Sequence, residues 1–433
     1  MTPRIGFYGD DFTGATDTLA LATRAGLRTL LFLRVPTHRE LEAAGPLDCV
    51  GVAGVARSLA PEAMAAEVKP AARLFAELHT PVIHYKCCST FDSSPAVGSI
   101  GAAVACLRPF VANRFVPVVG GQPNLGRYCL FGNLFAASET GGPVFRIDRH
   151  PTMRAHPVTP MGEADLRVHL ARQGLERVES VPYTAYALPA EALDASIART
   201  LGEQPDAVLF DVGHVDHLAK VGRIVWERAQ RAPLLAVGPS SVVQALAAHW
   251  GEPSGTASGV PVPPVRGPVF VIAGSLSPVT ARQVAAAASF TRVALDAARI
   301  TGDDSEYVDV MVERMTMELR AGRNVLAHTS GPEGKRGGSP QRIATGCGAI
   351  LKRVLAAAPV RRAGVAGGDT SSHALSALEI TALSYVGDLA PGAALCRAHA
   401  PGSPLDGLEL LLKGGQMGGV DLFERLVGPP GEC

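Results

Sequence analysis

The sequence lacks the patterns of several protein classes. Only 5% of its 433 residues are aromatic, and 40 basic residues are balanced by 40 acidic ones, so no basic surplus indicates nucleic-acid binding. No stretch approaches the ~20 uninterrupted apolar residues of a membrane-spanning helix. The eight cysteines form no CxxC pair, which favours free thiols in a reducing cytosol over a zinc site or disulfides. A strand is expected almost at the N-terminus, without a signal peptide. We therefore predict a soluble cytoplasmic protein that binds neither nucleic acid nor a membrane.

The fold class follows from length and from alternation. The chain of 433 residues is longer than one hydrophobic core usually serves. Short apolar runs alternate with helical patterns, which is typical of parallel sheets covered by helices. We predict an α/β protein of two α/β domains, with mainly parallel sheets and a cleft between them. A glycine- and proline-rich stretch interrupts the alternation, so we place an N-terminal domain at residues 1–250, a linker at 251–267 and a C-terminal domain at 268–433.

The first twenty residues hold an unusual pair of acids. Ile5 to Tyr8 is predicted to be a buried strand, and Asp10 and Asp11 follow it before a helix that Thr13 or Asp17 can cap. The pair should therefore lie at the carboxyl end of a strand, where open α/β sheets bind ligands. Two adjacent carboxylates repel each other, so a cation, a metal or hydroxyl donors should stabilise them. A solvated turn that only caps the helix is the alternative.

Further polar side chains are expected in loops near strand carboxyl ends of the N-terminal domain. Arginine and lysine there suit the carboxylate of a small acid, although lone basic residues are usually solvated surface charges. The set is Arg57, Lys86, Ser89, Asp92 and Arg127.

Three glycine-containing turns in the C-terminal domain share one chemical character. They begin at Gly274, Gly367 and Gly414, each after a predicted strand or apolar run and ahead of a helix. Glycine lets the backbone approach an anion closely, and helix N-termini offer free N–H groups. Together the turns predict a polyphosphate site, while each alone can be a simple connection. None of them matches GxxxxGK[ST] or GxGxxG, so neither a P-loop nor a Rossmann fingerprint is present.

In order along the chain, these motifs resemble the signature of the four-carbon acid sugar kinase family. The N-terminal part of the resemblance is Gly9-Asp10-Asp11-Phe12-Thr13-Gly14-Ala15, Ala56-Arg57-Ser58, Tyr85-Lys86 and Gly126-Arg127. The C-terminal part is Gly274-Ser275 with Ser277, Thr280 and Gln283, then Gly367-Gly368-Asp369-Thr370 and Lys413-Gly414-Gly415-Gln416-Met417-Gly418. The resemblance spans nearly the whole chain.

The resemblance implies ATP-dependent phosphorylation of a hydroxyl on a small sugar acid, with Mg2+ bridging the phosphates. The sugar acid would lie on the N-terminal domain and ATP on the C-terminal domain. Asp11, or its neighbour Asp10, would accept or orient the hydroxyl proton. The sugar acid would be bound by Arg57 and Lys86, which would hold its carboxylate, with Ser89, Asp92 and Arg127. The nucleotide would be bound by Ser275, Gly367, Gly368, Thr370, Gly414 and Gly415, with Asp369 as a contact of the nucleotide and the metal, or as a rival base.

Two departures from the family pattern fall on the sugar-acid side. Ser89 stands where an aspartate is usual, and the Arg-Gly pair that normally follows is missing. Gly120-Gly121-Gln122-Pro123-Asn124 replaces an aromatic-proline-glutamate stretch. Our first interpretation of the substrate is therefore 3-oxo-isoapionate, with 3-oxo-tetronate, threonate or erythronate as alternatives.

Two other classes of protein remain as alternative interpretations of the sequence. An NAD-dependent oxidoreductase of a sugar acid has the same alternation, although GxGxxG is missing. A non-catalytic two-lobed binding protein is the third class. Whether the chain forms a homo-oligomer stays open.

Overall fold

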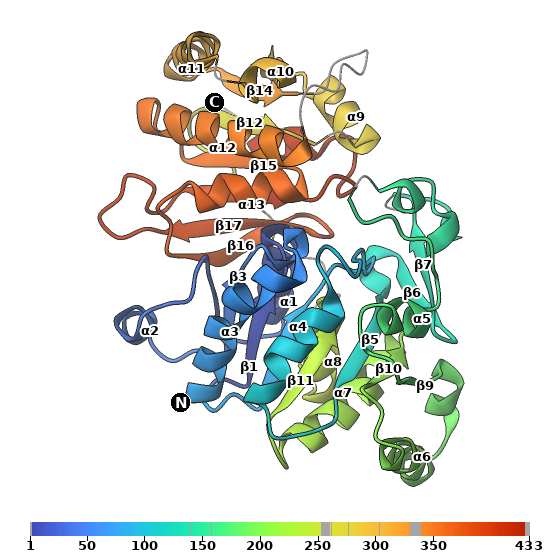
Figure 1. Cartoon of the computed structure of the whole chain (residues 1–433). Helices are drawn as coiled ribbons and strands as arrows, with labels where there is room; N and C mark the ends of the chain where they lie inside the picture. Colours follow the sequence, from blue (N-terminus) through green and yellow to red (C-terminus); the bar gives the residue numbers. More distant parts are fainter. Residues whose placement is uncertain are drawn as a thin grey trace. The chain divides into compact units, whose positions relative to one another are not determined.

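The chain forms two compact units, Met1–Ser258 and Gly259–Cys433. The computed structural model describes residues 2–139, 141–156, 158–252, 260, 262–275, 277–302, 304–329 and 339–428, with only the backbone of Pro340 and Asp369. Both units are α/β (Figure 1). Part of the predicted linker at 251–267 lies outside the described residues.

The N-terminal unit is built on a parallel sheet. Its strands, in spatial order, are β2 (Thr29–Phe32), β3 (Cys49–Ala53), β1 (Ile5–Gly9), β4 (Val82–Lys86), β11 (Leu234–Gly238), β5 (Pro117–Gln122), β10 (Ala207–Asp211) and β9 (Val178–Val181). The strands β1, β3, β4, β10 and β11 are buried along their whole length. They are apolar runs rather than alternating patterns, because helices cover both faces of a parallel sheet.

Eight helices of the described N-terminal residues surround this sheet. They are α1 (Phe12–Arg24), α2 (His38–Ala44), α3 (Pro61–Glu77), α4 (Ile100–Leu107), α5 (Leu166–Ala171), α6 (Ala190–Gly202), α7 (Asp216–Ala229) and α8 (Ser241–His249). Helices α3 and α4 pack side by side, and α8 packs against α1 and α7. An antiparallel extension follows β5 and consists of β6 (Arg127–Leu130), β7 (Asn133–Ala137) and β8 (Val144–Arg146). The predicted alternation did not include β6 and β7.

The C-terminal unit has a mixed sheet. The strands β13 (Phe290–Ala294), β14 (Asn324–His328), β12 (Val269–Ala273), β15 (Arg362–Ala366) and β18 (Glu409–Lys413) are parallel in that order. Two antiparallel strands continue the sheet beyond β18, namely β17 (Ala393–His399) and β16 (Ala382–Ala390). The described helices are α9 (Pro278–Ala286), α10 (Ala297–Ile300), α11 (Ser305–Arg320), α12 (Pro340–Ala357), α13 (Gly368–Ser376) and α14 (Leu422–Val427). Figure 1 shows α12 and α13 side by side, over β12 and β15.

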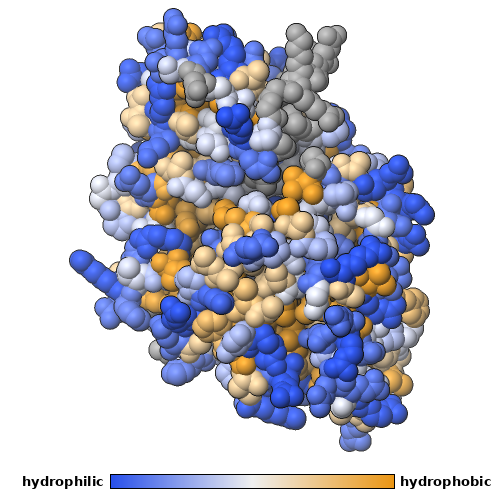
Figure 2. Space-filling view, viewed as in Figure 1, coloured by the Kyte–Doolittle hydropathy of each residue, from blue (hydrophilic) through white to orange (hydrophobic). Residues whose placement is uncertain are grey.

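Two further observations concern the apolar character of the helices and of the surface. Among the described residues, no helix is both long and apolar enough to cross a membrane. Figure 2 shows hydrophilic side chains spread over both units on the visible face.

Candidate active site

The Asp-Asp pair lies at the point where the sheet order reverses. Strand β1 is flanked by β3 on one side and by β4 on the other, so ligand groups can gather beyond its carboxyl end. The backbone N–H of Asp10 donates to Lys86 O at 3.0 Å, and the N–H of Arg57 donates to Asp10 O at 3.1 Å. Three segments that are distant in the sequence therefore meet at Asp10.

Asp11 is the cap of α1. Its Oδ1 accepts from Gly14 N at 2.9 Å, so the prediction that Thr13 or Asp17 caps the helix is wrong. The other carboxylate oxygen of Asp11 forms an ion pair with Arg57. Lys86 Nζ lies 3.6 Å from Asp11 Oδ1 and 3.8 Å from Asp10 Oδ1. A Cβ at Gly14 would collide with Lys86 Nζ, which explains the glycine in the Asp-Asp-Phe-Thr-Gly motif.

The two aspartates have opposite electrostatics. Burial raises the pKa of Asp10 to about 6, although Lys86 and Arg57 partly offset that rise. Burial would also raise the pKa of Asp11, but Arg57, Lys86 and the Gly14 N–H outweigh it and hold that pKa below its ordinary value. Asp10 Oδ1 has no hydrogen bond within the described residues. Asp11 is therefore a fixed anion, whereas Asp10 can exchange a proton near neutral pH.

Asp92 and Ser89 lie in the turn after β4, as the sequence predicts. Asp92 accepts from Thr90 Oγ1 at 2.6 Å and lies 4.0 Å from Arg57 Nη1. Burial alone would raise the pKa of Asp92. The positive charge of Arg57 is the largest of the contributions that lower it, and together they hold the pKa of Asp92 below its ordinary value. Ser89 is buried in the same turn. Arg57 thus has two carboxylate neighbours already.

Arg127 differs from the other two predicted cations. It is 5% exposed and opens β6, and its guanidinium donates to the backbone carbonyl of Leu125. Its Nε has no hydrogen-bond partner, and no carboxylate forms an ion pair with it among the described residues. Burial lowers the pKa of Arg127, and the nearby Cys88 and Asp17 oppose this only in part. A buried guanidinium without a counter-ion is costly, so this side chain is suited to an anionic ligand.

Some polar groups of the N-terminal unit were not predicted as site residues. Gln122 is buried at the end of β5 and donates to Asp17 Oδ2 at 2.9 Å, and Ser240 Oγ donates to the same oxygen at 2.6 Å. Asn124 Oδ1 and Thr13 Oγ1 are buried without a hydrogen bond in the described part of the chain. The departure at Gly120 to Asn124 was the signal that could have drawn attention to Gln122 and Asn124.

The three glycine turns of the C-terminal unit meet at one edge of its sheet. They follow β12, β15 and β18, which are neighbours, and Ser275 N donates to Ala366 O at 3.2 Å. A Cβ on Gly274 would lie 2.5 Å from Thr370 Oγ1, and one on Gly367 2.8 Å from the same atom. A Cβ on Gly415 would lie 2.9 Å from Ser275 Oγ. Only glycine fits these positions, and the N-terminus of α13 opens among them.

A buried lysine, not predicted as a site residue, supports the third turn. Lys413 is 0% exposed and its Nζ donates to Thr280 Oγ1 at 2.9 Å and to Gln283 Oε1 at 2.6 Å. Gln283 Nε2 donates in turn to three consecutive carbonyls of the turn, those of Met417, Gly418 and Gly419, at 3.0, 3.1 and 2.9 Å. Burial lowers the pKa of Lys413 to about 7.

The remaining predicted nucleotide residues lie in these turns. Gly368 begins α13 and Gly414 follows β18 directly. The side chain of Asp369, the predicted metal contact, lies outside the described part of the structure. Among the residues that are described, no group of three histidine, cysteine or acidic side chains is arranged to hold a metal ion.

Comparison with known proteins agrees with a sugar-acid site on the N-terminal unit and a nucleotide site on the C-terminal unit. Residues 5–246 match the family model of a sugar-binding N-terminal domain, and residues 270–423 match that of a nucleotide-binding C-terminal domain. A 3-oxo-isoapionate kinase of Paraburkholderia graminis is 39% identical over 97% of this chain and 93% of its own length. A 3-oxo-tetronate kinase of Methylobacterium radiotolerans is 32% identical over 98% of this chain and 99% of its own.

The protein belongs to the four-carbon acid sugar kinase family. A crystal structure of a Salmonella typhimurium LT2 protein shares the fold with a TM-score of 0.78 at 24% identity, covering 97% of this chain and 98% of that one. Membership makes the protein a sugar-acid kinase that uses ATP. The alternative of an NAD-dependent oxidoreductase is wrong, because curated relatives over the whole chain are kinases. The non-catalytic binding protein is excluded on the same ground.

Proposed function

We propose that the protein transfers the γ-phosphoryl group of ATP to a hydroxyl of 3-oxo-isoapionate. The identity of 39% to a 3-oxo-isoapionate kinase over nearly the full length carries this choice of substrate. The two departures at Ser89 and at Gly120 to Asn124 support it, because both lie on the sugar-acid side. A 3-oxo-tetronate is the second candidate, favoured by the relative that is 32% identical.

We assign the role of proton acceptor to Asp10. General-base catalysis is most efficient when the pKa of the base is near the working pH. The pKa of about 6 and an Oδ1 that accepts no hydrogen bond from the described residues support this role for Asp10 better than for the ionised Asp11. Asp11 would hold Arg57 and Lys86 in place, so that both cations face the reacting groups.

The carboxylate of the sugar acid would bind to Arg127. This changes our first assignment to Arg57 and Lys86, whose charges are already compensated by Asp11, Asp92 and Asp10. A guanidinium offers a planar fork that binds a carboxylate with two parallel hydrogen bonds. Asn124 and Thr13, each with a free buried oxygen, would contact hydroxyl groups of the same ligand.

The ATP phosphates would be bound by the main chain of the three glycine turns. Thr370 and Ser275 pack so closely against Gly274, Gly367 and Gly415 that the main chain of the turns must stay bare, and this observation supports a triphosphate site. Ser275, Gly368, Thr370 and Gly414 complete the proposed set, and Mg2+ bound to the phosphates would neutralise their charge. Contact of Asp369 with the metal stays a prediction, as does the cytoplasmic location of the enzyme.

A coupled ADP-release assay tests the proposal. The panel contains 3-oxo-isoapionate, both 3-oxo-tetronates that differ in configuration, threonate and erythronate, each with ATP and Mg2+. We expect the highest kcat/KM with 3-oxo-isoapionate, and no ADP release above background from the Asp10→Asn protein prepared in parallel. A higher kcat/KM for a 3-oxo-tetronate would reverse the order of the two candidates. Absence of ADP release with the whole panel would reject the substrate class.

A further inference from the structure

A second pocket lies in the C-terminal unit, at the sheet edge opposite the glycine turns. It has a volume of about 710 Å3 and includes the first residues of β15 and β18, Arg362 and Glu409. Both strands end at the other edge, immediately before the turns that begin at Gly367 and Gly414. The pocket is therefore a full strand length away from the proposed nucleotide site, and the kinase reaction does not use it.

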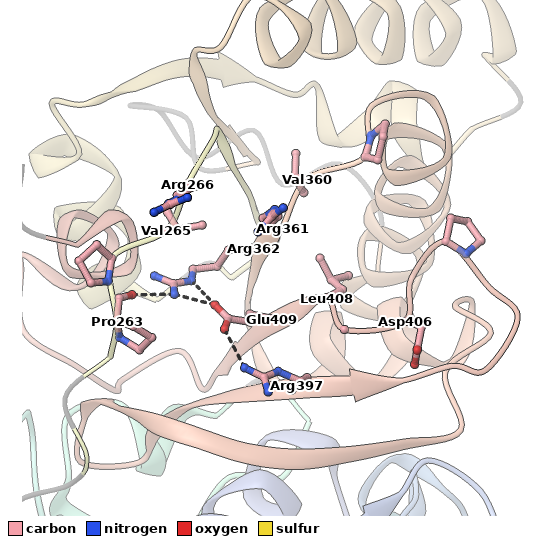
Figure 3. A pocket seen from close by; sticks show the side chains of 14 residues that line it. Pro263, Val265, Arg266, Val360, Arg361, Arg362, Arg397, Asp406, Leu408 and Glu409 are labelled. Atoms are coloured by element: carbon pink, nitrogen blue, oxygen red, sulfur yellow. Dashed lines mark hydrogen bonds and ion pairs between the residues drawn. The ribbon is translucent and has the colours of Figure 1, made fainter. Parts of the chain in front are cut away.

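One arginine of this pocket is structural. Arg362 is 1% exposed and donates to Glu409 Oε2 at 2.6 Å, to Pro263 O at 2.8 Å and to Leu426 O at 2.9 Å. It joins the chain ahead of β12 and the end of α14 to the sheet. Arg397 lies 3.5 Å from the other oxygen of Glu409, so a single carboxylate serves two guanidinium groups (Figure 3).

Two further arginines have no counter-ion. Arg266 and Arg361 line the pocket, are exposed, and form no ion pair or side-chain hydrogen bond within the described residues. In Figure 3 they extend from neighbouring segments on the same side of the pocket as Arg362. Asp406 is the second acid of the lining, and its Oδ1 already accepts from Ala400 N at 2.8 Å. Four arginines against two carboxylates leave a surplus of two positive charges.

The walls of the pocket are preformed. Four of the lining residues are prolines, at positions 263, 264, 359 and 404, and proline fixes its backbone φ angle. Little ordering is then needed on binding, which lowers the cost of holding a ligand. The volume lies within the range of roughly 300–1,000 Å3 that small-molecule sites have. Guanidinium groups pair bidentately with carboxylates and phosphates.

We propose that this pocket binds a small organic anion that carries at least two negative groups, phosphate or carboxylate. The ligand would bridge Arg266 and Arg361 and share Arg397 with Glu409. Because β15 and β18 connect the pocket to the glycine turns, an anion bound here is positioned to influence the nucleotide site through two strands.

Isothermal titration of the full chain tests the site. The probes are orthophosphate, citrate and 3-phosphoglycerate, which separate a phosphate, a carboxylate and a mixed ligand. Saturating Mg2+ and a non-hydrolysable ATP analogue keep the glycine turns occupied. The test variant is Arg266→Ala with Arg361→Ala. The matched control is Arg314→Ala with Lys352→Ala, which removes two exposed positive charges from α11 and α12, away from the lining.

We expect at least one probe to bind the wild-type and control proteins equally, and the test variant about tenfold more weakly, the loss that one charge-assisted hydrogen bond represents. The Arg266→Lys, Arg361→Lys protein should retain part of the affinity, and salt should weaken binding. Equal affinity of the test variant and the wild type for every probe, or no binding of any probe, would overturn the proposal. These readouts do not depend on turnover, so they are separate from the test of the kinase substrate.

Discussion

The two proposed binding regions use opposite chemistry at equivalent places. Both lie beyond the carboxyl ends of parallel strands, where α/β sheets bind ligands. The N-terminal region presents buried, ionised side chains, with Asp10, Asp11, Arg57 and Lys86 in one contact network. The C-terminal region presents main chain, and side chains are excluded at Gly274 and Gly367. A change of side chain can therefore alter which ligand the N-terminal region binds, whereas at its glycine positions the C-terminal region tolerates no added side chain.

This contrast explains where the sequence departs from its family. Ser89 and the Gly120 to Asn124 stretch are unusual, and both belong to the region of side-chain recognition. The glycine turns are expected to be nearer to the family pattern, since ATP is the substrate that kinases of this family share. Substrate choice is thus expected to depend on the N-terminal region alone, and the following changes test that separation.

The largest effect is expected from Asp10→Asn. The variant keeps the size of the side chain but cannot accept a proton. We expect kcat to fall by about 10²–10⁴-fold with little change in the KM for ATP. Single-turnover transfer of labelled phosphate measures it. Asp11→Asn is the comparison, since it removes the partner of Arg57 and should lower the unfolding midpoint as well. Full activity of Asp10→Asn would assign the base elsewhere.

The next contrast is between Arg127, which is buried, and Arg57, which is partly buried. Arg127→Met removes a cation that has no carboxylate partner, so we expect the unfolding midpoint without ligand to stay the same or rise. The KM for the sugar acid should increase by roughly 10–100-fold, the cost of losing a charge-assisted hydrogen bond. Arg57→Met should instead lower the midpoint, because it leaves Asp11 and Asp92 unpaired in the interior.

Thermal unfolding with and without sugar acid, together with steady-state kinetics, measures both variants. Arg199→Ala is the control, because this residue is exposed on α6 and outside the site. If Arg127→Met binds the sugar acid as well as the wild type, Arg127 is not the carboxylate anchor.

The main-chain region is tested by Gly367→Ala. The residue has φ +124° and its new Cβ would lie 2.8 Å from Thr370 Oγ1, so strain and crowding coincide at the proposed phosphate site. We expect the KM for ATP to rise about tenfold, from a strain of roughly 1–3 kcal/mol, and the KM for the sugar acid to change little. Gly402→Ala is the matched control, with φ +82° and no atom within 4 Å of the new Cβ. Equal effects of both changes on ATP would reject the main-chain cradle.

The sequence predicted the parts of this arrangement that local chemistry determines. The strand before Asp10 and the glycine turns follow from apolar runs that end in glycine or acids. The antiparallel strands β16 and β17 were missed although the turn signal Pro391-Gly392 lies between them, because the predicted alternation of strands and helices allowed for parallel strands only. Lys413 was not predicted as a site residue, and the structure buries it at the end of β18, where Thr280 and Gln283 supply its acceptors.

The distribution of charge in the candidate site could not be predicted. Arg57, Lys86 and Arg127 look alike in sequence, as basic residues expected in loops near strand carboxyl ends. Which of them has a counter-ion depends on tertiary contacts between segments that are distant in the sequence, such as Arg57 with Asp11, 46 residues away. The cap of α1 was misplaced for a local reason, because Asp11, Thr13 and Asp17 are all residues that can cap a helix.

The smallest predicted effect concerns pH. With a pKa of about 6, Asp10 is mostly ionised at neutral pH and loses its capacity as a base on acidification. We expect kcat/KM to fall about fourfold between roughly pH 7.5 and 5.5, along a single ionisation.

Protonation of Asp10 does not unfold the protein at low pH, so this loss of rate is not a loss of folded enzyme through Asp10. The reason is that the pKa of Asp10 in the folded state lies above its ordinary value of 3.8. The stability that this carboxyl contributes is present at low pH and is lost only as pH rises through about 6. A pH profile of kcat/KM, with the unfolding midpoint measured at each pH, separates protonation of the catalytic base from loss of stability. A rate that is flat down to pH 5 would mean that Asp10 is not the group that accepts the proton.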